Sequence, residues 1–542
     1  MRKKLVRSIF FGAALFLLPA TQPLRAQENL LNVGEKQQIT TEIQQVEIRQ
    51  FEITGNTLIE TSRLEKLLSS YVGRKLSFVE LKAAADAVTN EYFTRGYVNS
   101  YAWLPVQEID GVVKIQVSEG AVGSIKVSGN HSYSSSFIRK HLEGSIGSTG
   151  ALDSRKLERG LLILNDYPNL KVQADLEAGA EAGKTDIYVA AGEKKPAPLN
   201  GSVFASNHGS RYTGRNRFGA SWRLGNLTGS ADYLDLTLMT SPNHESWRNM
   251  LYGKAAYYHP LGYQGTKLRL EFAVSGYDLG GRLKPLGIVG DSEVFTIGLS
   301  HPLRRSREKN LYLMGAVSRR DYKNYLFERT FNTSTDQYSV FEIGLNGDCS
   351  RQRRSLAWSV LLSGGLGEFF GGMSDRAYAN SSRPALADGS WTKINLSANT
   401  GFRLNNMHRL QLRCEGQLSG DPLLSSEQGS IGGPDSVRAY PVAEYTGDQS
   451  YLLSAEYHVP FFRNGKPREN AAWVVFVDHG GTKINDRLPG EKDGSLSGCG
   501  LGLRFVFARN LSLSFDAAVP LGDEDASDGD HARFWLSLSQ PF

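Results

Sequence analysis

The C-terminal two-thirds of the chain is dominated by alternation of apolar and polar residues. Segment 267–274 reads Lys-Leu-Arg-Leu-Glu-Phe-Ala-Val, and segment 410–418 reads Leu-Gln-Leu-Arg-Cys-Glu-Gly-Gln-Leu. The last twelve residues follow a similar pattern and end on the aromatic Phe542. Because side chains of a strand alternate between its two faces, these segments predict strands with one apolar and one mostly polar face.

From about residue 198 such patterns follow one another to the end of the chain. A soluble β-sandwich could also alternate in this way, with its charged face outward. The many long strands and the aromatic C-terminus favour an all-β transmembrane barrel, with an apolar outside and a wet lumen. The 345 residues of 198–542 accommodate about 16 antiparallel strands, although 14 or 18 also fit. We expect long loops at 321–337, 370–390 and 419–446.

The N-terminus has the pattern of a secretion signal. Residues 1–26 combine a basic start, an apolar stretch from Ile9 to Leu18 and a small residue, Ala26, before the expected cleavage. This apolar stretch is too short to span a bilayer. Without this segment, 56 basic residues face 56 acidic ones, so the charge balance does not indicate a nucleic-acid partner. The three cysteines have no disulfide or metal-ligand spacing.

Residues 47–192 contain an internal repeat. The string Phe51-Glu-Ile-Thr-Gly55-Asn56 returns 74 residues later as Ile125-Lys-Val-Ser-Gly129-Asn130. Each copy begins with a short alternating strand that ends in a Gly-Asn turn. Two helical patterns follow, at 61–70 and 78–94 in the first copy and at 134–142 and 153–165 in the second. Two strands close each copy, which predicts two small α+β domains with helices on one face of a sheet.

This half resembles the polypeptide-transport-associated (POTRA) domains of two-partner secretion transporters of the hemolysin-activator type. The resemblance rests on the order of several strings in the first copy. They are Phe51-Glu-Ile-Thr-Gly-Asn-Thr, Tyr71-Val-Gly-Arg-Lys-Leu-Ser, Glu91-Tyr-Phe-Thr-Arg-Gly-Tyr-Val, Leu104-Pro-Val-Gln and Asp110-Gly-Val-Val-Lys-Ile-Gln-Val-Ser-Glu-Gly. It implies tandem periplasmic POTRA domains, followed by a 16-stranded barrel in the outer membrane.

Two strings in the barrel resemble the signature motifs of this transporter superfamily. The first, Val437-Arg438-Ala439-Tyr440, lies in a Gly-rich loop; the second, Phe476-Val-Asp478-His-Gly480, ends an apolar strand. The resemblance implies that the loop folds back into the lumen and that its arginine meets the aspartate on the barrel wall. Ala439 stands where the family usually has glycine, which puts the geometry of the loop tip in doubt.

The parity of the second string supports the same placement independently. If Trp473, Val475 and Val477 face lipid, the residues between them face the lumen. An ionised Asp478 in hydrocarbon would be strongly unfavourable, so we expect its carboxylate inside. Gly480 leaves room for a loop to approach the wall. An arginine can bind a carboxylate through two parallel N–H groups.

The predicted organisation divides the chain into five parts. They are a signal peptide (1–26), a short N-terminal segment (27–46), POTRA domain 1 (47–120), POTRA domain 2 (121–194) and the transmembrane barrel (198–542). Family members often carry an N-terminal helix that occupies the pore. Only Gln27 to Val46 precede the repeat here, so we expect no full-length plug.

The predicted function is secretion of a partner exoprotein, of the hemolysin or adhesin type, across the outer membrane of a Gram-negative bacterium. The POTRA domains would bind the unfolded client in the periplasm. The barrel would contact outer-membrane lipid and depend on the barrel-assembly machinery for its own insertion. The alternatives are a factor that assembles other barrels and a passive porin. The histidines lie in separate segments, and neither a phosphate loop nor zinc spacing is evident, so we expect no catalytic residue, metal site, cofactor or nucleic acid.

Overall fold

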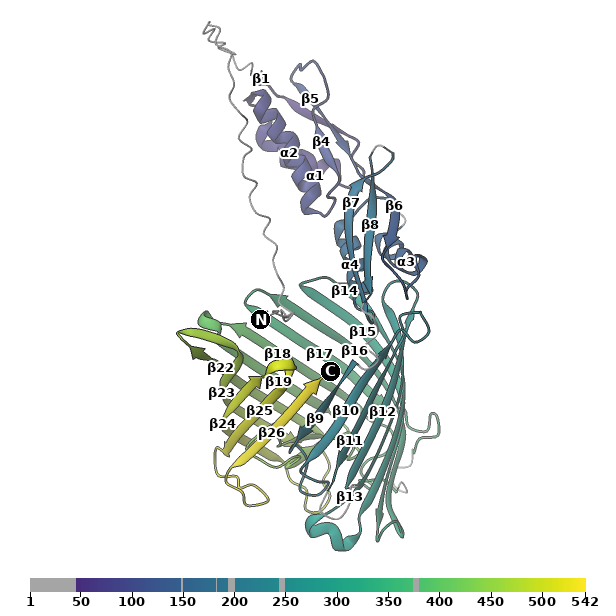
Figure 1. The fold of residues 1–542 in the computed structure, drawn as a ribbon, viewed down its shortest axis with the longest axis vertical. Helices are drawn as coiled ribbons and strands as arrows, with labels where there is room; N and C mark the ends of the chain where they lie inside the picture. Colours follow the sequence, from purple (N-terminus) through teal and green to yellow (C-terminus); the bar gives the residue numbers. More distant parts are fainter. Residues whose placement is uncertain (1–44, 148–149, 182, 194–199, 243–248, 374–379) are drawn as a thin grey trace, which may run out of the picture.

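The structure is a computed structural model that describes residues 45–147, 150–181, 183–193, 200–242, 249–373 and 380–542. The predicted signal peptide and most of the predicted N-terminal segment lie outside these residues. Two small α/β domains follow one another along the chain and lead into a large barrel (Figure 1). The α+β and all-β fold class predicted from the sequence is therefore confirmed. None of the described helices is long and apolar enough to cross a membrane.

The first small domain has helices on one face of a three-stranded sheet. The central strand β5 pairs in parallel with β2 and antiparallel with β4. Side chains that alternate along β2 and β5 enter the core, together with one face of α2. The domain consists of β1 (Val46–Glu47), β2 (Gln50–Thr54), α1 (Thr61–Leu68), η1 (Ser69–Tyr71), β3 (Lys75–Leu76), α2 (Phe78–Thr94), β4 (Tyr101–Trp103) and β5 (Val112–Ser118).

The second small domain repeats this arrangement. Its central strand β8 pairs in parallel with β6 and antiparallel with β7. The elements are β6 (Ala121–Ser128), α3 (Ser135–Ile146), α4 (Ser154–Asn165), β7 (Leu170–Ala178) and β8 (Lys184–Glu193). The Gly-Asn turn is conserved in its geometry between the two copies. Gly55 and Gly129 both have positive φ, and a Cβ at either glycine would overlap a carbonyl oxygen of the central strand.

A glutamate at the end of each central strand accepts hydrogen bonds from the residues after this turn. Glu119 accepts hydrogen bonds from the backbone N–H groups of Thr57 and Leu58, both at 2.7 Å. Glu193, 74 residues later, accepts three such bonds from residues 131–133 at 2.6–3.1 Å. Burial opposes ionisation of both carboxyls, but hydrogen bonds outweigh it and lower their pKa values; for Glu119 the hydroxyls of Thr57 and Tyr92 contribute most, ahead of the backbone N–H groups. The hydrogen bonds of these two glutamates fix the loop between the first strand and the first helix in each domain.

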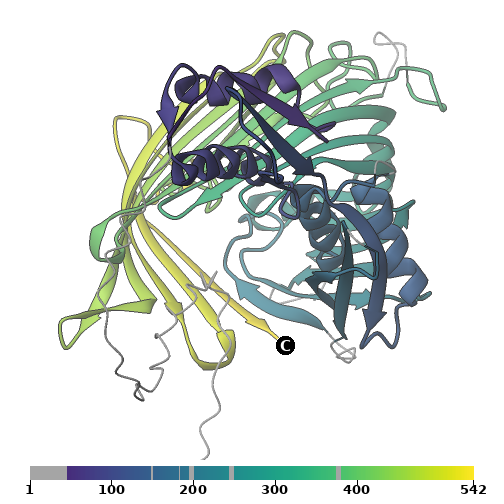
Figure 2. The ribbon, with the colours of Figure 1, turned by 90° about the horizontal axis from the view of Figure 1, so that it is seen from above.

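The second domain rests on the end of the barrel nearest to it. Arg305 donates two parallel hydrogen bonds to Asp166, each 2.8 Å long. Arg307 pairs with Glu158 at 2.7 Å, and Tyr263 packs edge-on against His141 with ring centroids 5.2 Å apart. These contacts place the domain over one part of the rim (Figure 2).

His141 gives this junction a pH-dependent stability. Its Nδ1 lies 2.9 Å from the carbonyl of Phe137, so the neutral ring donates there, and its Nε2 accepts from the hydroxyl of Tyr167 at 2.9 Å. Burial lowers the pKa of the imidazole below 6.5. The unfolded chain therefore binds this proton more readily, and stability is lost as pH falls below about 6.5.

We expect the second small domain of the membrane-inserted protein to become more sensitive to protease between pH 7.5 and 5.5. In His141→Gln this His141-dependent part of the change should disappear. An identical pH dependence in both proteins would contradict the assignment to His141.

The barrel is closed and has 16 strands, as predicted. Consecutive strands pair antiparallel, and the last strand, β26, returns to the first, β9. The strands are β9 (Asn200–Ser206), β10 (Arg217–Gly225), β11 (Tyr233–Ser241), β12 (Met250–Leu261), β13 (Thr266–Asp278), β14 (Val289–Arg305), β15 (Lys309–Leu326), β16 (Phe331–Arg351), β17 (Arg354–Gly365), β18 (Thr392–Arg403), β19 (Arg409–Ser419), β22 (Gln449–Arg463), β23 (Lys466–Lys483), β24 (Gly494–Val506), β25 (Ser512–Pro520) and β26 (Arg533–Pro541). The connections include η2 (Gly281–Leu286), η3 (Asn405–Met407) and η4 (Ala508–Asn510).

The outside of the barrel is apolar, as the alternation requires. On β13 and β14 the outward side chains are 36–49% exposed; they are Leu270, Phe272, Val274, Phe295, Ile297 and Leu299. A continuous exposed apolar surface of this kind marks contact with lipid.

The prediction of a long loop at 321–337 is wrong. Residues 321–326 and 331–337 extend β15 and β16, and only a four-residue turn, 327–330, joins them. This part of the hairpin is polar on both faces: Thr333 and Gln337 are exposed, whereas Asp336 on the other face is buried and accepts hydrogen bonds from Ser382. Alternation is lost there, because neither face needs apolar side chains. The other two predicted loops lie between strands, although residues 374–379 of the first are outside the described part.

Candidate functional site: a buried ion pair between a lumen loop and the barrel wall

The long connection between β19 and β22, residues 420–448, is called here the lumen loop. It contains a short antiparallel hairpin of β20 (Gly429–Ile431) and β21 (Tyr445–Gly447). Gly432 and Gly433 follow β20 with φ of 100° and 103°. A Cβ on Gly432 would lie 2.3 Å from the carbonyl oxygen of Pro441. Glycine is therefore required where the loop turns toward its tip.

The tip brings Arg438 onto Asp478 of β23. Nε and Nη2 of the arginine each donate to one carboxylate oxygen at 2.8 Å, and the backbone N–H of Arg438 adds a bond of 3.2 Å. Both residues are buried, with 4% and 1% exposure. Two parallel N–H bonds fix the orientation of a guanidinium as well as its distance. The two motif residues are thus in direct contact.

The remaining donors of Arg438 contact residues that the sequence analysis did not single out. Nη1 pairs with Glu456 on β22 at 2.6 Å and lies 4.0 Å from Asp516 on β25. Ser454 donates to Asp478 at 2.7 Å. These side chains share the inward parity of their strands, which is the signal that could have identified them. The arginine therefore faces three carboxylates from three strands.

Apolar contacts close over the ion pair. The guanidinium lies 3.5 Å from the centre of the Phe476 ring, a cation–π contact. Val437 and Tyr440 are fully buried in the same cluster. The outward residues Trp473, Val475 and Val477 are 46–50% exposed. His479 also faces outward, where it contacts the hydroxyls of Tyr451 and Ser497.

Two glycines of the wall make room for the loop. A Cβ on Gly480 would lie 3.2–3.3 Å from methyl groups of Ile431 and Val437. A Cβ on Gly498 of β24 would lie 2.5 Å from the Cβ of Ala439. Ala439 is absent from the non-glycine residues with positive φ, so its backbone does not require glycine. The methyl group that departs from the family pattern is accommodated by Gly498.

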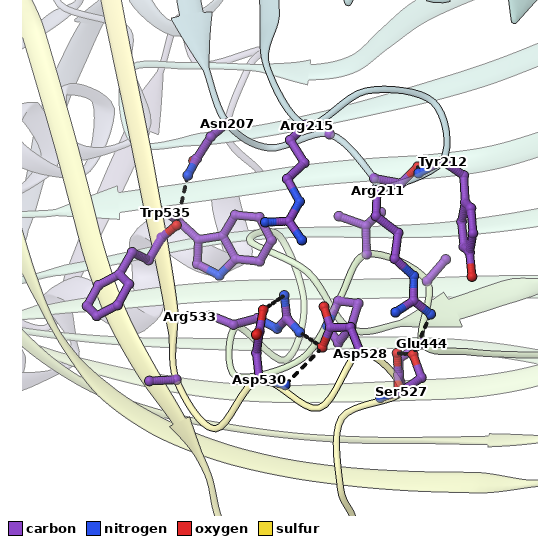
Figure 3. Close-up of a pocket in the computed structure, with 17 residues that line it drawn as sticks. Asn207, Arg211, Tyr212, Arg215, Glu444, Ser527, Asp528, Asp530, Arg533 and Trp535 are labelled. Carbon is purple, nitrogen blue, oxygen red and sulfur yellow. Dashed lines mark hydrogen bonds and ion pairs between the residues drawn. The ribbon is translucent and has the colours of Figure 1, made fainter. Parts of the chain in front are cut away.

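The tip also reaches the seam where β26 meets β9. Trp535 of β26 donates to the carbonyl of Arg438 at 2.7 Å. The seam has five paired residues on each strand, and the side chain of Asn207 continues it (Figure 3). Its amide donates to the carbonyl of Phe534 at 2.8 Å, as Figure 3 shows, and accepts from the N–H of Leu536 at 2.8 Å. Loop, seam and wall are therefore connected through Arg438.

A cavity of about 280 Å³ adjoins this seam (Figure 3). It lies between the connection 207–216, residues 441–444 of the lumen loop and the connection 521–532. Glu444 accepts from Ser527 through both its carboxylate oxygens, at 2.6 and 2.7 Å. The hydroxyl of Tyr440 donates to the carbonyl of Glu524 at 3.0 Å. Residues 440–444 of the lumen loop are thus held by the last connection of the barrel.

This arrangement can hold a segment of chain across a wet lumen and release it. A multiply bonded, buried ion pair is specific in geometry and is lost as a unit when one partner is removed. Among the described residues there is no group of three or more His, Cys, Asp or Glu placed to hold a metal ion.

The comparisons with known proteins agree with this architecture. The model of the family described as haemolysin secretion/activation protein ShlB/FhaC/HecB matches residues 183–505, and that of the ShlB-type POTRA domain matches residues 46–120. The heme/hemopexin transporter protein HuxB of Haemophilus influenzae (strain 86-028NP) is 25% identical over 97% of this chain and 91% of its own.

Two further matches concern transporters named CdiB. The outer membrane transporter CdiB of Escherichia coli O6:K15:H31 (strain 536 / UPEC) is 26% identical over 90% of this chain and 81% of its own. The solved structure of CdiB from Escherichia coli superposes with a TM-score of 0.77 at 23% identity, covering 94% of this chain and 93% of that one. At this identity the structural match shows the fold.

Proposed function

Since the chain belongs to the haemolysin secretion/activation family ShlB/FhaC/HecB, we propose that its POTRA domains bind an unfolded partner protein and that its barrel lumen conducts it past the lumen loop. The chain is an outer-membrane transporter of the two-partner secretion type, with its POTRA domains in the periplasm. The client is a large exported protein of the hemolysin or adhesin type. Folding of the client outside the cell supplies the free energy for export, because the folded client cannot return through the barrel.

The observation that carries this proposal is the bonding of Arg438 to Asp478 inside a closed barrel. A loop held there by a buried ion pair occupies space that an extended polypeptide needs. The loop is bonded to the wall rather than continuous with it, so it can move as a unit when those bonds break. A passive porin has no need of tandem POTRA domains.

The edges of the POTRA sheets indicate how an unfolded client binds. In the first domain, the hydroxyl of Thr89 accepts from the N–H of Ala102 at 2.9 Å and so occupies the outer edge of β4. In the second, the amide of Asn165 bonds both the N–H and the carbonyl of Val172 on β7. Helix side chains thus block one edge of each sheet. The opposite edges, β2 and β6, are where an extended segment can add a strand.

Photo-crosslinking tests this choice of edge. Glu52 on β2 and Tyr101 on β4 are both exposed and lie on opposite edge strands of one sheet. A photoreactive residue at 52 is expected to crosslink the client during export, whereas the same residue at 101 should give at most background crosslinking. Stronger crosslinking at 101 would place the client on the other edge.

The function itself is tested by deleting the gene and restoring it on a plasmid. We expect one large protein to vanish from the medium and to return on complementation, with other outer-membrane barrels at normal abundance. A general fall in those barrels, with no specific loss from the medium, would instead indicate a barrel-assembly factor.

A further inference from the structure

A second buried charge of the lumen loop lies outside both signature motifs. The side chain of Glu427, two residues before β20, is 1% exposed. One carboxylate oxygen is 2.5 Å from Nη1 of Arg320 on β15, and the other is 2.8 Å from Nζ of Lys393 on β18. Two cations from two strands thus neutralise one carboxylate of the loop.

Neutral donors complete the set of bonds at this residue. The hydroxyl of Tyr338 on β16 donates to the carboxylate at 2.5 Å. The backbone carbonyl of Glu427 accepts from Lys393 at 2.8 Å and from Gln417 of β19 at 3.0 Å. The wall therefore grips both the side chain and the backbone of Glu427. Leu423 and Leu424 pack beside it against Tyr338 in a small apolar cluster.

This site lies on a different sector of the barrel from the Arg438 site. Glu427 contacts β15, β16, β18 and β19, whereas Arg438 contacts β22, β23 and β26 and lies near β25. In the strand order around the barrel the two groups do not overlap, and they adjoin where β19 pairs with β22. Only ten residues, 428–437, lie between the two anchors. The lumen loop is therefore held to the wall at two places, residue 427 and residue 438.

A buried carboxylate at this position adds little net stability, because the free-energy cost of removing the charged groups from water offsets much of their attraction. An apolar side chain of similar size would stabilise the protein at least as well. What the charge supplies is a defined position, since only one placement of the loop satisfies Arg320, Lys393 and Tyr338 together.

We propose that Glu427 is a second anchor of the lumen loop, so that export requires release from two sectors of the wall rather than from Arg438 alone. This inference rests on the proposed function. With both anchors in place, the lumen loop is fixed to the wall at two points and cannot swing about a single one. Without the charge of Glu427, the residues around position 427 are held less tightly to the wall, while Arg438 stays bound to Asp478.

The test replaces Glu427 with glutamine, which keeps the shape and removes the charge. The matched control is Glu342→Gln. Glu342 accepts from the same Arg320 at 2.8 Å, but it belongs to the wall strand β16 and not to the loop. The readout is the labelling rate of a cysteine at 424, where Leu424 is fully buried. The label is a membrane-impermeant maleimide, used on whole cells whose transporter has its three native cysteines replaced by serine.

We expect Glu427→Gln to increase labelling at least about tenfold and to alter export of the client, while Glu342→Gln labels at the parental rate. Heat-modifiable migration in gels verifies that each barrel is folded. If Glu427→Gln does not insert, Lys393→Gln loosens the same anchor from the wall side and is expected to increase labelling in the same direction.

Parental labelling rates in the folded Glu427→Gln barrel, or in its Lys393→Gln substitute, would overturn the second anchor. Equal increases in the Glu427 and Glu342 variants would do so as well, because the effect would then belong to Arg320 and the wall. Failure of the parental protein to export any client would contradict the proposed function instead, and the labelling result would stand independently of it.

Discussion

Replacing Arg438 with alanine is expected to reduce export of the client at least about tenfold, while the barrel still inserts and folds. The substitution leaves the buried carboxylate of Asp478 without its main partner. An uncompensated buried charge costs a few kcal/mol, less where water reaches it. The loop tip should leave the wall and lose its fixed position. The measurement is the amount of client in the medium, normalised to folded transporter in the membrane.

Arg413→Ala is the matched control for this loss. Arg413 also faces the lumen and pairs with a carboxylate, Glu415 at 2.7 Å, but among the described residues it has no hydrogen bond or ion pair with the lumen loop. Export by this variant should stay near the parental level. Normal export by Arg438→Ala would remove the ion pair from the mechanism, and equal loss in both variants would assign the effect to lumen charge in general.

Gly498→Ala is expected to impair export strongly, and Ala439→Gly in the same chain is expected to restore it. The added methyl group would lie 2.5 Å from the Cβ of Ala439, a distance that forces the loop tip or β24 to move. Removing the methyl of Ala439 leaves its backbone nitrogen at 3.5 Å as the nearest loop atom. In the double variant the methyl group at 498 should therefore occupy the space that the methyl group of Ala439 has left.

The same export assay measures both variants, with Gly416→Ala as the control. A Cβ on Gly416 would have its nearest neighbour at 3.8 Å, so this change should be nearly neutral. If the double variant exports as poorly as Gly498→Ala alone, the contact between the loop tip and β24 is not what the substitution disturbs.

The strand pattern and the two motifs predicted much of this fold. Alternation along β23 placed Phe476 and Asp478 inside, because a lipid-facing strand has only one parity for charge. The hairpin of β15 and β16 was misread as a loop, since its outer part is polar on both faces and keeps no apolar–polar period. Apolar–polar alternation identifies the parts of strands that contact lipid, and it does not identify their extensions beyond the membrane.

The partners of the motif residues could not be read from the sequence. Glu456, Asp516 and Trp535 lie on three different strands, and only the closure of the barrel brings them together around Arg438. A further signal was present and was missed. Glu119 and Glu193 repeat at the same spacing of 74 as the Gly-Asn turns, and each closes the turn of its own domain.

The most direct test of a polypeptide path through the barrel compares two neighbouring positions on β18. Leu396 is 42% exposed on the apolar outside, and Ser397 bonds to Ser359 on the lumen side at 2.7 Å. With a client stalled during export, a photoreactive residue at 397 is predicted to crosslink to it and the same residue at 396 is not. Crosslinking at 396 alone, or at neither position while export proceeds, would contradict conduction through the lumen.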